Sequence, residues 1–126
     1  MTNKTATKKI LHIDDEEDTL EVVKIILEKE GFEIARATSG ASALKKIKAD
    51  DFSLIILDLM MPDMSGWDLF TQITKIKPDH NVIFLSVLEI SKEKLKEFKD
   101  SGIKDYIKKP FDKDDLVVRV KKAING

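Results

Sequence analysis

At residues 9–15 the chain reads Lys-Ile-Leu-His-Ile-Asp-Asp, a short apolar run that ends in two acids. Two later apolar runs also end in a charged residue: Asp58 closes the run at 54–57, and Lys109 follows a run that ends at Ile107. If these runs are parallel strands of one sheet, their carboxyl ends lie along one edge, where ligands of such sheets bind. Three carboxylates and one ammonium would then converge. Such a group is suited to a divalent metal ion and a phosphoryl group.

The composition is that of one ordinary globular domain, with 126 residues of which 42% are hydrophobic and 36% charged. Lys and Arg number 22 against 23 Asp and Glu, so a general basic field for nucleic acid is absent. The absence of cysteine excludes disulfides and thiolate metal sites. No apolar stretch approaches the roughly 18 residues that cross a bilayer. The start of the chain lacks the apolar core of a signal peptide, so we expect a cytoplasmic protein without membrane contact.

Short apolar runs alternate with amphipathic stretches five times along the chain. We expect strands at residues 9–13, 33–37, 53–57, 81–85 and 105–107. We expect helices at residues 17–30, 39–48, from Trp67 to Pro78, at 91–102, and along the apolar stripe from Leu116 to Ile124. This alternation predicts a doubly wound α/β domain with a parallel sheet covered on both faces. The domain is expected at residues 8–126, after a polar tail at 1–7.

Each candidate site residue also has an ordinary structural explanation. Asp14 and Asp15 open an acidic run at a helix start, where carboxylates favour the positive end of the helix dipole. Asp58 could cap a turn, but a carboxylate that directly ends an apolar strand needs a cation or donors to compensate its desolvation. Lys109 alone could be solvated, since Lys108 stands beside it. Because these residues mark the ends of the first, third and fifth strands, the joint site is the preferred interpretation.

These residue types suit phosphoryl transfer. Mg²⁺ prefers oxygen ligands and keeps several waters. An aspartate can attack a phosphoryl group to give an acyl phosphate, while a metal ion and a lysine neutralise the transferring oxygens. Ser86, at the end of the fourth strand, could hydrogen-bond a phosphoryl oxygen or cap the following loop, and these alternatives are about equal.

Four motifs follow one another along the chain. They are Asp14-Asp15-Glu16 after a strand, Asp-Leu-Met-Met-Pro-Asp-Met-Ser-Gly at 58–66, Ser86, and Tyr-Ile-Lys-Lys-Pro-Phe at 106–111. Together they closely resemble the receiver domain of two-component response regulators, from about Lys8 to the end of the chain. The resemblance implies a flavodoxin-like sheet of five parallel strands in the order 2-1-3-4-5, with five helices.

By this resemblance, Asp58 is the phosphoacceptor for a phosphohistidine on a sensor histidine kinase or phosphotransfer protein. Asp15, Asp58 and the backbone carbonyl of Met60 would bind Mg²⁺, with Asp14 reaching the ion largely through water. Lys109 would pair with Asp58 and then with the phosphoryl group. The chain would not be an enzyme, but a phosphoacceptor that takes part in its own Mg²⁺-dependent phosphotransfer and dephosphorylation.

The resemblance also implies a switch. Ser86 would turn toward the phosphoryl group and Tyr106 would rotate inward, although a half-buried packing role is the alternative for this tyrosine. The change would alter the helix at 91–102, the strand at 105–107 and the last helix, and so dock a downstream protein, an output domain or a second copy of the chain. The Lys109–Pro110 bond is expected to be cis.

One residue departs from the family pattern, since the position after Ser86 is usually small and is Val87 here. This branched side chain should crowd the phosphoryl group. We therefore expect rates of transfer or hydrolysis that differ from those of Val87→Ala. The two histidines, His12 and His80, form no cluster that suggests zinc, and each is expected to be simply buried or solvent-facing.

Three other functions fit the sequence less well. A phosphohydrolase of the haloacid dehalogenase type needs an acid two residues beyond its nucleophile, where this chain has Met60. A flavodoxin-like cofactor binder needs a phosphate loop after the first strand, whereas the acids at 14–18 would repel a phosphate that lacks a metal ion. A module that is never phosphorylated is disfavoured by the intact site residues. No direct nucleic-acid contact is expected within this chain, and whether it acts alone or within a longer regulator stays open.

Overall fold

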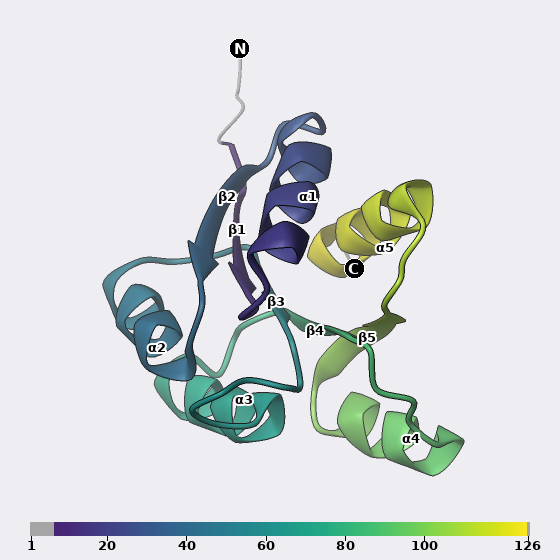
Figure 1. Cartoon of the computed structure of the whole chain (residues 1–126). Coiled ribbons are helices and arrows are strands. Elements are labelled where there is room, and N and C mark those ends of the chain that lie inside the picture. Colours follow the sequence, from purple (N-terminus) through teal and green to yellow (C-terminus); the bar gives the residue numbers. More distant parts are fainter. Residues whose placement is uncertain (1–6, 126) are drawn as a thin grey trace.

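Five parallel strands form a central sheet with helices on both faces (Figure 1). The computed structural model describes residues 7–125. The strands are β1 (Lys9–Ile13), β2 (Glu33–Ala37), β3 (Leu54–Leu57), β4 (Val82–Ser86) and β5 (Ile103–Lys108). The helices are α1 (Glu17–Glu28), α2 (Gly40–Ala49), α3 (Gly66–Ile76), α4 (Lys92–Asp100) and α5 (Lys113–Asn125). The strand order β2-β1-β3-β4-β5 confirms the predicted doubly wound sheet.

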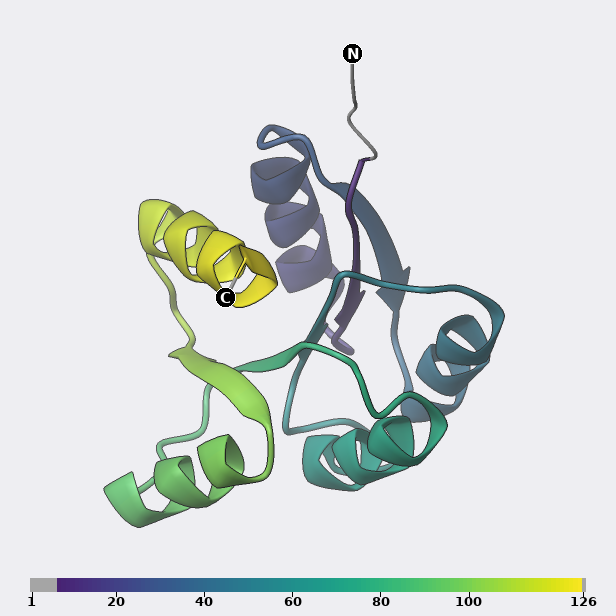
Figure 2. The same cartoon turned by 180° about the vertical axis from the view of Figure 1, so that it is seen from behind.

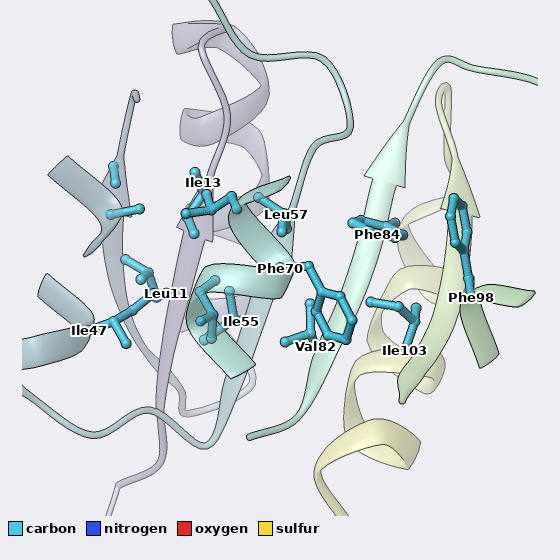
Figure 3. Close-up of a cluster of buried hydrophobic side chains, with 14 residues drawn as sticks. Leu11, Ile13, Ile47, Ile55, Leu57, Phe70, Val82, Phe84, Phe98 and Ile103 are labelled. Carbon is cyan, nitrogen blue, oxygen red and sulfur yellow. The ribbon is translucent and has the colours of Figure 1, made fainter. Parts of the chain in front are cut away.

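Two apolar clusters lie on opposite faces of the sheet, because successive side chains of a strand point to opposite sides. Helices α1 and α5 cover one face, and α2, α3 and α4 cover the other (Figures 1 and 2). Figure 3 shows the cluster under α2, α3 and α4, which extends from Leu11 and Ile13 of β1 to Phe70 of α3 and Phe98 of α4. Strands β3 and β4 are buried along their whole length, as their continuous apolar sequence predicts for central parallel strands.

Three helices begin at a serine whose side-chain oxygen accepts the amide three residues on. These serines are Ser39, Ser65 and Ser91, and two of them, Ser39 and Ser91, were predicted as helix starts. The first helix ends at Glu28, two residues earlier than predicted. The chain leaves it through a turn in which Gly31 has a φ of 92°, a conformation that favours glycine.

The edge strand β5 is longer than the predicted 105–107. Val82 pairs with Ile103 and Ile83 with Asp105, so Lys104 is an extra residue that bulges from the ladder. Charged residues at the start of an edge strand hide its apolar pattern, because an edge tolerates charge that a central strand does not. The predicted tail lies outside the described residues except for its last position. Among residues 7–125, none of the helices is both long enough and apolar enough to span a membrane.

Candidate functional site

The carboxyl ends of β1, β3 and β5 bring three of the predicted residues into contact. The Nζ atom of Lys109 lies 2.7 Å from Oδ2 of Asp14 and 3.1 Å from Oδ2 of Asp58. All three side chains are buried, with exposed fractions of 0% for Asp14, 5% for Asp58 and 8% for Lys109. An ammonium and two carboxylates therefore share a pocket that excludes most of the surrounding water.

Backbone hydrogen bonds fix these residues at the ends of the strands. The amide of Asp14 donates to the carbonyl of Ala37 (3.1 Å), and the amide of Asp58 donates to that of Ile13 (3.1 Å). Between the ends of β5 and β4, the amide of Lys109 donates to the carbonyl of Ser86 (2.8 Å). Each site residue thus extends the sheet's hydrogen bonding by one step beyond its strand. The following Lys109–Pro110 bond is cis, as expected.

Glu16 is a member of the group that the sequence did not single out. Its Oε1 lies 3.0 Å from Nζ of Lys109, and its amide donates to Oδ1 of Asp14 (3.0 Å). Asp14, Glu16 and Asp58 each offer a carboxylate oxygen within 4.8 Å of the others. The acidic run after β1 was a signal, but which of its members turns inward depends on the path of the loop into α1.

Asp15 lies outside that three-carboxylate group and is exposed. It lines a shallow surface pocket together with the loop at 59–65. The same loop is joined to the phosphoacceptor candidate, because the amide of Met60 donates to Oδ1 of Asp58 (3.0 Å). Two of the predicted metal ligands, Asp15 and Met60, therefore line one surface pocket next to the buried Asp58.

The loop at 59–65 is fixed by hydrogen bonds from α2 to Asp63 and by the close packing of Gly66 after it. Asp63 accepts the amides of the first two residues of α2, at 2.9 and 3.1 Å, and these hydrogen bonds lower its pKa. Gly66 packs so closely that an added Cβ would lie 2.3 Å from the carbonyl oxygen of Asp58. The loop that carries the Met60 carbonyl is thereby tied to α2 and pressed against the site.

Lys109 forms ion pairs with three carboxylates in this pocket. Burial lowers the pKa of Lys109, but hydrogen bonds to Asp14, Glu16 and Asp58 outweigh burial, so its pKa is raised and the ammonium stays charged. Burial raises the pKa of Asp14, against hydrogen bonds from Lys109 and from the amide of Glu16 that lower it. When all three acids are ionised, one ammonium leaves negative charge uncompensated. An all-oxygen donor set with excess negative charge fits a hard divalent cation such as Mg²⁺.

The two predicted switch residues lie on adjacent strands. Ser86 ends β4 and is fully buried, and its Oγ accepts the amide of Leu88 at 3.5 Å. Tyr106 on β5 is half-buried, and its hydroxyl donates to the carbonyl of Leu88 at 2.5 Å. The ring of Tyr106 stacks on Phe98, whose ring stacks on Trp67 at a centroid distance of 5.2 Å. A row of aromatic rings therefore joins β5 to α3 through α4.

Val87 and His12 border the site on different sides. Val87 is 53% exposed and lines a surface pocket with Lys109 and the residues that follow it. His12 is buried, with an exposed fraction of 1%, and its Nε2 lies 3.8 Å from Oδ2 of Asp14. Neither ring nitrogen of His12 has a hydrogen-bond partner within residues 7–125.

A family model described as "Response regulator receiver domain" matches residues 10–121. The transcriptional regulatory protein CrdR of Helicobacter pylori is 36% identical over 122 residues, which are 94% of this chain and 55% of that protein. The response regulator SaeR of Staphylococcus aureus is 31% identical over 111 residues, 88% of this chain and 48% of that protein. The chain thus spans about half the length of the curated relatives it matches.

Solved structures give the same similarity over nearly whole chains. A response regulator receiver domain protein (CheY-like) from Methanospirillum hungatei JF-1 superposes with a TM-score of 0.87 at 32% identity, covering 95% of both chains. The response regulator protein TrrA from Thermotoga maritima, in complex with Mg²⁺ and BeF, has a TM-score of 0.81 at 35% identity and covers 93% of this chain and 99% of that one.

Proposed function

Because this chain belongs to the response regulator receiver domain family, whose general function is a phosphorylation switch, we propose that Asp58 accepts a phosphoryl group from a phosphohistidine. The donor would be a sensor histidine kinase or a phosphotransfer protein. The observation that carries the proposal is the buried pair of Asp58 and Lys109, 3.1 Å apart, at the carboxyl edge of the sheet. A nucleophile and a fixed positive charge are thereby placed together where a donor can approach.

The chain's own groups orient the nucleophile before a donor arrives. The amide of Met60 holds Oδ1 of Asp58 and the ammonium of Lys109 holds Oδ2, so the carboxylate is fixed in one orientation. An oxygen of Asp58 would form the new bond to phosphorus while the phosphorus–nitrogen bond of the donor breaks, and the imidazole keeps that electron pair. Lys109 would offset the charge on the transferring oxygens.

The donor set supports binding of Mg²⁺ at this edge. Asp14, Asp15, Asp58 and the backbone carbonyl of Met60 are the proposed ligands, and the carboxylate of Glu16 lies near enough to contribute. A bound ion would supply further neutralisation of phosphoryl oxygens. The TrrA structure supports this reading, because its crystals hold Mg²⁺ and BeF.

The output would be carried by side chains next to the phosphoryl group. Ser86 would hydrogen-bond a phosphoryl oxygen, and Tyr106 would give up its bond to Leu88 and turn inward. The surface of α4, β5 and α5 would then change for a downstream protein, an output domain or a second copy of the chain. The domain would take part in its own phosphotransfer and dephosphorylation, and a cytoplasmic location belongs to the same proposal.

Incubation with acetyl phosphate and Mg²⁺, followed by intact-mass measurement, tests the proposal. We expect a gain of roughly 80 Da, the mass of HPO₃, that is lost in mild base because acyl phosphates are labile. Asp58→Asn should abolish the gain, and Asp15→Asn should weaken its dependence on Mg²⁺. Asp68→Asn, which changes an exposed acid of α3, is the matched control and should be labelled normally. A label that persists in Asp58→Asn would assign the nucleophile elsewhere.

A further inference from the structure

His12 is a buried polar side chain for which the proposed phosphotransfer has no use. It lies inside β1 between Leu11 and Ile13, and both of its ring nitrogens are unpartnered in the described structure. Buried polar groups are nearly always hydrogen-bonded, and leaving one unpaired is costly. The place of His12 beside the site offers a reason for its presence.

The unpaired ring faces one particular oxygen of the site. Asp14 directly follows β1, two residues after His12, and its amide continues the hydrogen bonding of the sheet, so the two side chains lie on the same side of the sheet. The Nε2 atom of His12 is 3.8 Å from Oδ2 of Asp14, just beyond hydrogen-bond distance. That same Oδ2 is held by Lys109 at 2.7 Å, whereas Oδ1 is held by the amide of Glu16. The histidine therefore faces the oxygen whose partner, Lys109, also contacts Glu16 and Asp58.

We propose that His12 is a reserve hydrogen-bond donor that takes over Oδ2 of Asp14 when Lys109 turns to the phosphoryl group on Asp58. This inference rests on the proposed function. Lys109 is shared among Asp14, Glu16 and Asp58, so a new anion on Asp58 competes for it. With Mg²⁺ held through Oδ1 of Asp14, Oδ2 is left without a partner, and a fully buried oxygen that loses its partner carries a penalty. A shift of less than roughly 1 Å brings the ring within hydrogen-bond distance and removes that penalty.

The charge state of the ring fits this role. His12 is almost wholly buried, and burial disfavours a charged ring. A neutral ring carries one N–H, which can sit on Nε2. A neutral donor can approach Asp14 without repelling the ammonium of Lys109. His12 acts through Asp14 and is a positioning residue.

NMR of the imidazole N–H groups measures directly whether His12 becomes the hydrogen-bond donor to Asp14. The chain has two histidines, and His80 serves as an internal reference because its Nε2 pairs with Thr74 at 2.9 Å and it lies before the start of β4, whereas the site is at the carboxyl ends of the strands. On addition of Mg²⁺ and beryllofluoride, a phosphoryl mimic, the Nε2–H proton of His12 should move downfield while the signals of His80 stay in place. A His12 that carries its proton on Nδ1 in this complex would overturn the proposal.

Two substitutions separate the reserve donor from a packing role. His12→Leu removes the donor, and we expect it to weaken binding of Mg²⁺ and beryllofluoride by about tenfold. His12→Gln places an amide N–H near the position of Nε2 and should bind within about twofold of the wild type. Without ligands, His12→Leu should resist urea at neutral pH at least as well as the wild type, because it removes two unpaired buried atoms. A Leu variant with unchanged affinity would overturn the proposal.

A third variant makes failure of the inference distinguishable from failure of the proposed function. Lys109→Met removes the partner of Asp14 directly, so the Nε2–H signal of His12 should move downfield without Mg²⁺ or beryllofluoride. If wild-type protein gains no phosphoryl group on Asp58, the proposed function fails. If it is labelled but the His12 signal is unmoved both in Lys109→Met and in the beryllofluoride complex, the reserve donor alone fails.

Discussion

Lowering the pH from about 7.5 to about 5 should destabilise this fold by roughly 2 kcal/mol through His12 alone. Burial lowers the pKa of His12 from 6.5 to about 3 in the folded chain. The unfolded chain takes up a proton on this ring below pH 6.5, and the folded chain does not until about pH 3. Since the unfolded state binds more protons in this window, stability falls as the pH falls through it. Each pH unit below 6.5 is worth about 1.4 kcal/mol, and pH 5 lies about 1.5 units below.

Urea unfolding at the two pH values measures this effect, with Trp67, the single tryptophan, as the fluorescent probe and a chelator present. His12→Leu lacks the titrating ring, so its loss of unfolding free energy between the two pH values should be smaller by about 2 kcal/mol. Comparing the two proteins at both pH values cancels the contributions of the carboxylates. His80→Gln is the control, because the ring of His80 is only half-buried and its lowered pKa should contribute less.

Equal pH dependence in wild type and His12→Leu would refute the reasoning. It would mean that the folded chain protonates this ring as easily as the unfolded chain does. Water would then reach His12 beside Asp14, and the ring would not be a dry, neutral donor.

Three further substitutions test the loop and the rim of the site. Asp63→Asn weakens the hydrogen bonds to the first amides of α2 and should lower the thermal midpoint at neutral pH, measured by circular dichroism. Because these hydrogen bonds lower the pKa of the Asp63 carboxyl, the difference from wild type should vanish as the pH falls through that pKa. Gly66→Ala places a Cβ against the backbone of Asp58 and should cost about 1–3 kcal/mol in urea unfolding, and normal stability would show that this backbone yields. Val87→Ala should change the rate of labelling by acetyl phosphate or of its hydrolysis, measured by intact mass, and identical rates would dismiss crowding at this position.

Much of the fold and part of the site could be predicted because both follow from strand topology. Once five apolar runs alternate with helices, a parallel sheet places Asp14, Asp58 and Lys109 at one edge, and the structure has them in contact. The inward turn of Glu16 could not be predicted, because it depends on the loop after β1, for which an acidic run carries no geometric signal. The start of β5 was missed because the charge of Lys104 interrupts its apolar pattern, and such a charge is tolerated at the sheet edge.

Three backbone hydrogen bonds extend the sheet by one residue beyond β1, β3 and β5, and they limit which parts of the site can move on phosphorylation. The amides of Asp14, Asp58 and Lys109 are hydrogen-bonded to neighbouring strands, so the reactive groups are attached to backbone that belongs to the sheet. Deuterium uptake at these three amides should be among the slowest in the domain, with or without a phosphoryl group. The structural change on phosphorylation must therefore occur through side-chain rotations and loop movements, while the sheet beneath them keeps its shape.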